Sequence, residues 1–139
     1  MQEYMKIAIM EAKKSLENED IPVGAIIIKN NKIIARAHNE KEHLNVATRH
    51  AEMIAIEKAC MQLNTWHLDG CILVTTMEPC MMCCGAIIQS RIKKIIYGVH
   101  NEKYGCCKLL DKKYKIECSK YDIDNDIIIM LKEFFKERR

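Results

Sequence analysis

The chain lacks any long apolar run, because nowhere do about 18 apolar residues follow one another, the length that a membrane-spanning helix needs. The stretch from Met1 to Tyr4 contains an acidic side chain and no apolar segment of signal-peptide length. Internal repeats, low-complexity segments and linkers are also lacking. We therefore expect one domain, residues 1–139, that is soluble and cytoplasmic, or also nuclear if the source is a eukaryote.

A large excess of one charge is missing as well. The 22 Lys and Arg residues nearly balance 19 Asp and Glu residues, which leaves a formal net charge of +3. A weakly basic surface is compatible with nucleic acid, but an ordinary mixed surface explains the same value equally well. Net charge therefore selects no partner.

Cysteine, in contrast, is abundant, with eight residues in a short chain. In a secreted protein this number would indicate a disulfide scaffold, whereas the absence of a signal peptide indicates a reducing compartment. Metal binding is therefore the first interpretation of the cysteines.

Hydrophobic periodicity predicts helices and strands in alternation. Pro79 lies where a helix is expected to start, a position that favours proline. Strands that alternate with helices behind one hairpin predict an α/β fold whose mixed sheet is covered on both faces. The expected elements are a helix over 2–17, a hairpin of strands over 23–28 and 32–37 with its turn at Asn30-Asn31, a polar loop over 39–48, a helix over 50–61, a strand over 71–76, a helix over 79–89, strands over 94–99 and 114–121, and a last helix over 126–136.

Two short motifs, His50-Ala51-Glu52 and Pro79-Cys80-Met81-Met82-Cys83, each lie at a predicted helix start. Cysteines at i and i+3 share one helix face, so Cys80 and Cys83 can bind the same ion, and a helix N-terminus favours their thiolate forms. His50 supplies a third ligand. Sulfur with imidazole indicates zinc, and three ligands without a fourth are typical of a catalytic site that is open to water.

The position of Glu52 predicts the chemistry. Zinc lowers the pKa of bound water from 15.7 to about 7, which provides a nucleophile at neutral pH. At i+2 from His50, the Glu52 carboxylate diverges from the ligand direction and is free to carry a proton from water to a leaving amine. This combination predicts hydrolytic deamination.

The pattern H-x-E with P-C-x-x-C is the signature of zinc deaminases that act on nucleobases. Over nearly the whole chain, segments 21–25, 47–53 and 76–83 resemble the tRNA adenosine deaminases, which convert the wobble adenosine of an anticodon to inosine. Ala47-Thr48-Arg49 and the segment 97–107, with Asn101, are similar to the catalytic subunit of the eukaryotic two-subunit enzyme. The chain departs from the family in a short stretch between Leu110 and Tyr114 and in Lys108, where relatives carry a small residue.

This resemblance implies a cytidine-deaminase-like three-layer α/β/α sandwich with a mixed five-stranded sheet. It implies one zinc ion bound by His50, Cys80 and Cys83, with Glu52 as the proton shuttle. It also implies a dimer, either with a related non-catalytic subunit or with itself. The residues expected to contact the tRNA are Asn39 at the target nucleoside, and Phe134, Phe135, Lys136, Arg138 and Arg139 at the anticodon loop.

Several alternatives stay open for the cysteines and histidines. His50, Cys80 and Cys83 can form a purely structural zinc site, and Cys106-Cys107 can reach this ion or a second one. The remaining thiols and imidazoles have no partner at recognisable ligand spacing, so we expect buried core thiols and surface or loop histidines. They are Cys60, Cys71, Cys84 and Cys118, and His38, His43, His67 and His100.

Two other functions fit the same motifs. The first is deamination of a free nucleobase or nucleoside such as guanine, cytosine or cytidine, because the zinc motif specifies the reaction and leaves the base open. The second is a non-catalytic subunit that binds RNA and keeps zinc for structure. The presence of Glu52 argues against the second.

Overall fold

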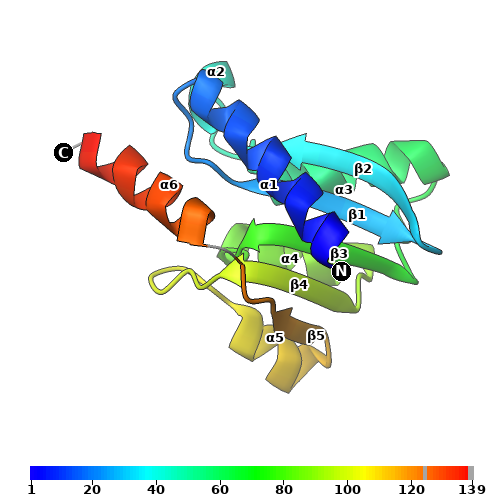
Figure 1. Ribbon diagram of the computed structural model, residues 1–139. Coiled ribbons are helices and arrows are strands. Elements are labelled where there is room, and N and C mark those ends of the chain that lie inside the picture. Colours follow the sequence, from blue (N-terminus) through cyan, green and yellow to red (C-terminus); the bar gives the residue numbers. More distant parts are fainter. Residues whose placement is uncertain (124, 138–139) are drawn as a thin grey trace.

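A five-stranded sheet forms the centre of the computed structural model, which describes residues 1–123 and 125–137 (Figure 1). The strands lie in the order β2-β1-β3-β4-β5. β1 is antiparallel to β2 and to β3, whereas β3, β4 and β5 are parallel to one another, so the sheet is mixed. The strands are β1 (Gly24–Lys29), β2 (Lys32–His38), β3 (Cys71–Met77), β4 (Lys94–Val99) and β5 (Glu117–Lys120).

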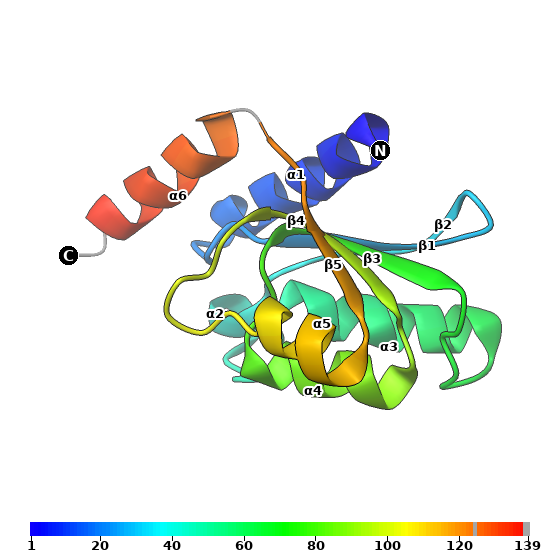
Figure 2. The same ribbon diagram turned by 90° about the horizontal axis from the view of Figure 1, so that it is seen from below.

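Helices cover both faces of the sheet (Figure 2). α1 and α6 lie on one side of it, and α3, α4 and α5 lie on the other. The expected three-layer α/β/α sandwich with a mixed five-stranded sheet is therefore confirmed. The helices are α1 (Gln2–Glu17), α2 (Lys41–Leu44), α3 (Ala51–Leu63), α4 (Met81–Ser90), α5 (Cys107–Tyr114) and α6 (Asn125–Glu137). Within the described residues, no helix combines the length and apolar character needed to cross a membrane.

The turn between β1 and β2 follows the prediction. Asn30 and Asn31 have φ values of 51° and 62°. Two-residue hairpin turns of type I′ require positive φ at both central positions, and asparagine tolerates that conformation better than most residues. The polar pair therefore explains why the chain reverses here.

Alternating side chains of the central strands fill two cores. Ile27 and Leu73 belong to the core shared with α3 and α4, while Ile26 and Val74 belong to the core shared with α1. Gly24 permits the close approach of α1, because a Cβ at this position would lie 1.9 Å from the backbone oxygen of Ala8. Both faces of the sheet are therefore packed against helices.

Two short helices differ from the expectations. The strand expected over 114–121 is only Glu117–Lys120, because α5 occupies Cys107–Tyr114 in front of it. Cys107 and Leu110 are both buried, and their i,i+3 spacing gives α5 one apolar face that is too short to be distinctive. α2 forms inside the expected polar loop, where the buried Asp20 carboxylate accepts hydrogen bonds from the first backbone amides of the helix.

Glu11 joins α1 to β2 through a buried carboxylate whose side chain is 4% exposed. Burial raises the pKa of Glu11. Hydrogen bonds from Lys14 and His38 and the charges of Lys14 and Arg36 together lower it by a larger amount, so the net pKa falls below 4.5. Lys14 Nζ lies 2.8 Å and Arg36 Nε 3.1 Å from Oε2. The ionised carboxylate therefore stabilises the folded state.

We expect Glu11→Gln to destabilise the fold by about 1–3 kcal/mol at pH 7, because buried donors lose their charged acceptor. A lowered folded-state pKa contributes stability above the unfolded value of 4.5, and this contribution disappears as the pH falls through the folded value. The difference from the parent should therefore shrink below pH 4.5 in urea unfolding. Glu117→Gln, at an exposed ion pair with Lys94, is the control and should have little effect. Equal stability of parent and Glu11→Gln at pH 7 would contradict the assignment.

Candidate active site

The starts of α3 and α4 bring the motif residues together. His50 is the N-cap residue of α3, Cys80 is the N-cap residue of α4, and Cys83 lies in the first turn of α4. β3 ends at Met77 and delivers the chain to Cys80, while α3 packs beside α4. The two motifs therefore meet at one end of the sheet, as their positions at helix starts predict.

The distances among these ligand atoms fit a zinc ion. His50 Nδ1 lies 3.6 Å from Cys80 Sγ and 3.7 Å from Cys83 Sγ, and the two sulfur atoms are 3.8 Å apart. A tetrahedral ion with Zn–S of about 2.3 Å and Zn–N of about 2.0–2.1 Å requires S···S of about 3.8 Å and S···N of about 3.6 Å. Among the residues that the structure describes, these three form the His, Cys, Asp or Glu group close enough to share an ion.

The electrostatic environment of Cys80 and Cys83 favours a thiolate at Cys80. A hydrogen bond with Cys83 lowers the pKa of Cys80 to about 3 against the opposing effect of burial, and His50 adds to the lowering. The same contact raises the pKa of Cys83. Cys80 therefore needs no strong base to become a metal ligand.

Glu52 lies in the first turn of α3, outside the ligand group, and is 4% exposed. Burial raises the pKa of its carboxyl to about 7, and its own backbone amide and His50 oppose this rise. A carboxyl group with such a pKa can accept and return a proton near neutral pH.

A pocket of about 560 Å³ opens over these residues. Its lining includes His50, Glu52 and Cys80, together with residues from several segments that lie far apart in the sequence. The volume lies in the range of small-molecule sites, so it has room for one nucleobase with its sugar. The lining residues are Ile21, Val23, Asn39, Lys41, His50, Ala51, Glu52, Met77, Glu78, Cys80, His100, Asn101, Glu102, Lys103, Tyr104 and Phe135.

Asn39 lines the pocket from the end of β2 and is 5% exposed. Its Nδ2 donates to the Ile21 carbonyl oxygen at 3.3 Å, and its Oδ1 accepts from the Lys41 amide at 3.2 Å. These contacts orient the side-chain amide at the pocket wall. A contact between Asn39 and the target nucleoside remains a prediction.

The residues of α6 that were expected to contact RNA differ in their exposure. Phe134 is buried, whereas Phe135 is 45% exposed and lines the pocket. Lys136 lies on the adjacent apolar groove between α6 and the ends of β3 and β4. Arg138 and Arg139 lie outside the described residues.

The other cysteines are separate from the metal-ligand group. Cys84 is buried, and its Sγ lies 3.6 Å from the Pro79 carbonyl oxygen, as expected for a core thiol. Cys71 is also buried, and Cys60 and Cys118 are half-buried. Cys106 and Cys107 do not belong to the ligand group with His50, and Cys107 lies in the core.

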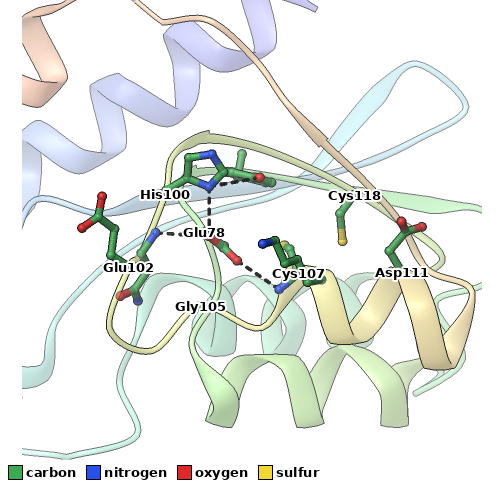
Figure 3. A pocket seen from close by; sticks show the side chains of 10 residues that line it. Glu78, His100, Glu102, Gly105, Cys107, Asp111 and Cys118 are labelled. Carbon is green, nitrogen blue, oxygen red and sulfur yellow. Dashed lines mark hydrogen bonds and ion pairs between the residues drawn. The ribbon is translucent and has the colours of Figure 1, made fainter.

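Sequence reasoning missed Glu78 and His100, which both line the pocket. His100 was expected to be an ordinary loop histidine, but its Nδ1 lies 3.3 Å from both Glu78 Oε1 and the Tyr97 hydroxyl (Figure 3). Glu78 lies directly before Pro79 and Cys80, and this position beside the cysteine motif was the one indication in the sequence that it lies near the site. Its partners lie more than 20 residues away, so spacing could not reveal them.

Comparisons with known proteins agree with this site. Residues 1–99 match the model of the cytidine and deoxycytidylate deaminase zinc-binding region. The chain is 41% identical to the "tRNA-specific adenosine deaminase" of Aquifex aeolicus, over 98% of this chain and 94% of that protein.

Solved structures give the same picture. A structure from a study of A-to-I editing by tRNA:A34 deaminases has a TM-score of 0.80 and 31% identity, covering 86% of this chain and 98% of that chain. Guanine deaminase from Bacillus subtilis has a TM-score of 0.68 and 30% identity, covering 99% and 92%.

The family model and the donor set agree on the cofactor, which is zinc. Because a relative matches almost end to end and the dimensions of the metal site fit the ion, the chain belongs to the tRNA-specific adenosine deaminase family of zinc-binding deaminases.

Proposed function

We propose that this protein is a zinc hydrolase that deaminates the wobble adenosine of tRNA anticodons to inosine. The observation that carries the proposal is the ligand group of His50, Cys80 and Cys83 beside the buried Glu52 carboxylate, in a chain 41% identical to a tRNA-specific adenosine deaminase. The free-base alternative has a solved relative in guanine deaminase from Bacillus subtilis, which is 30% identical to this chain, so free guanine is tested beside the RNA substrate. A cytoplasmic location suits the tRNA substrate.

The roles of the residues follow from their positions. His50, Cys80 and Cys83 would hold the ion, which when bound makes water a nucleophile at neutral pH. Glu52 accepts a proton from the attacking water and delivers it to the amine at C6, so that adenosine and water become inosine and ammonia. Burial of Glu52 keeps bulk water from competing for this proton.

The pocket walls supply the proposed contacts with the RNA. Asn39 is already oriented at the wall and would bind the target nucleoside through its side-chain amide. Phe135 is exposed at the rim, where a neighbouring base of the loop can stack on its ring. Lys136 lies one residue further along α6 and would contact a phosphate, and we assign the same role to Arg138 and Arg139.

We propose that the protein acts as a dimer, either with a related non-catalytic subunit or with itself. A net charge of +3 is small for a chain that must hold a tRNA at physiological salt, where counterions compete for each phosphate. A second subunit would add basic surface. Sizing of the isolated chain, together with its activity on full-length tRNA, tests this assembly, because an active monomer would exclude it.

The substrate assay uses an anticodon stem-loop with adenosine at the wobble position. We expect inosine and ammonia from this RNA and none from free guanine, cytosine or cytidine. The same RNA sequence annealed into a full duplex is the control, and it should react far more slowly, because a buried site cannot reach C6 of a stacked adenine. Equal rates on loop and duplex, or turnover of free guanine alone, would contradict the proposal.

A further inference from the structure

Glu78 lies two residues before Cys80 and contacts another segment of the pocket lining. Its side chain is 10% exposed, and its carboxylate faces residues 101–107, the segment that follows β4 and that we call the 101–107 loop (Figure 3). Oε1 accepts a hydrogen bond from the Asn101 backbone amide at 3.2 Å, and Oε2 accepts one from the Cys107 backbone amide at 3.0 Å. One carboxylate therefore holds both ends of the loop.

The 101–107 loop forms part of the lining of the same pocket as Glu52. Asn101, Glu102, Lys103 and Tyr104 all line the pocket. The far end of the loop is also tied to the ligand segment, because the Cys106 amide donates to the Pro79 carbonyl oxygen at 3.3 Å. The position of this loop relative to the ligand residues therefore depends on the contacts of Glu78 and its neighbour.

Gly105 shows how tightly the loop closes around the carboxylate. A Cβ at this position would lie 2.5 Å from Glu78 Oε2 and 2.5 Å from the Asn101 carbonyl oxygen. Its φ is not among the positive values, so the glycine is required by the close approach and not by the backbone conformation. Any side chain here would displace the carboxylate or the loop.

We propose that Glu78 is a positioning residue for substrate binding, which holds the 101–107 loop at the pocket wall and acts on the nucleic acid only through that loop. The inference rests on the proposed function, because its activity readout uses an RNA substrate. A direct electrostatic role predicts the opposite result, since a carboxylate beside a polyanion weakens binding and its removal would strengthen it.

Glu78→Gln separates these two roles. Glutamine has nearly the same shape but only one acceptor oxygen, so its NH2 group must face one of the loop amides and leave that donor unpaired. We expect KM for the anticodon stem-loop to rise about tenfold, which is what one lost hydrogen bond to a buried charged acceptor corresponds to, with kcat changed less than about threefold. Hydrogen exchange of the Asn101 and Cys107 amides should become faster in the free protein. Zinc content should stay that of the parent.

Gly105→Ala tests the same contact from the other side and should give the same pattern of raised KM and faster loop exchange. Glu11→Gln is the matched control, because it also removes a buried carboxylate that accepts several hydrogen bonds, on α1 and outside the pocket lining. It should lower the unfolding temperature without changing KM. This contrast distinguishes loop positioning from general destabilisation.

The possible results divide clearly. An unchanged or lowered KM in Glu78→Gln, or loss of zinc from this variant, would overturn the inference. Activity of the parent on the RNA would still support the proposed function in that case. If Glu78→Gln does not fold, an unchanged KM in Gly105→Ala would overturn it. A parent that turns over no RNA would overturn the proposed function and the inference with it.

Discussion

Replacement of Glu52 by alanine is expected to abolish nearly all turnover while zinc and fold are retained. Positioned general acid–base groups contribute typically about 10²–10⁴-fold to a rate, and burial raises the pKa of Glu52 to about 7, which suits proton transfer near neutral pH. Because Glu52 lies outside the ligand group, its loss should leave the zinc content unchanged. Single-turnover inosine formation measures the rate. Metal analysis measures the zinc content, and thermal unfolding tests whether the fold is retained.

Two further variants sharpen this result. Glu52→Gln keeps the shape of the side chain but cannot accept the proton, so it should be as slow as the alanine variant. Glu117→Ala removes an exposed carboxylate of β5 outside the pocket lining and should retain parent activity. Turnover of Glu52→Ala within a few-fold of the parent would remove Glu52 from the mechanism.

Cys80→Ser should lose both the metal and the activity. A serine hydroxyl stays protonated at neutral pH, whereas the environment of Cys80 lowers its pKa to about 3 and so favours the anionic ligand. The parent should carry about one zinc per chain, and the variant far less. Since zinc binds the folded state, the unfolding temperature should fall as well.

Cys84→Ser provides the matched control for this experiment. Cys84 adjoins the ligand Cys83 in the chain but is a core thiol outside the ligand group. The same chemical change there should cost some stability and leave the zinc content unchanged. Full zinc occupancy in Cys80→Ser would refute the ligand assignment, and equal zinc loss in both variants would show that serine acts through the fold.

The part of the fold that could be predicted is the part encoded locally. The α1 helix, the Asn30-Asn31 turn and β4 follow from periodicity and turn chemistry within a few residues. α5 could not be predicted in the same way, because its short apolar face, Cys107 and Leu110, is recognisable only once the sheet offers a surface to bury it. The strand order is likewise set by pairing between distant segments.

The same division applies to the site. By itself, the sequence determined which residues lie together as a group that could hold a metal ion, with Glu52 beside it. His50 and Glu52 share one helix start and Cys80 and Cys83 share another, so their spacing encodes their geometry. Only the tertiary structure decided what surrounds them. Glu78 meets the amides of Asn101 and Cys107 across 23 and 29 residues of chain, and contacts over such separations depend on how the parallel strands pack and leave no periodic trace in the sequence.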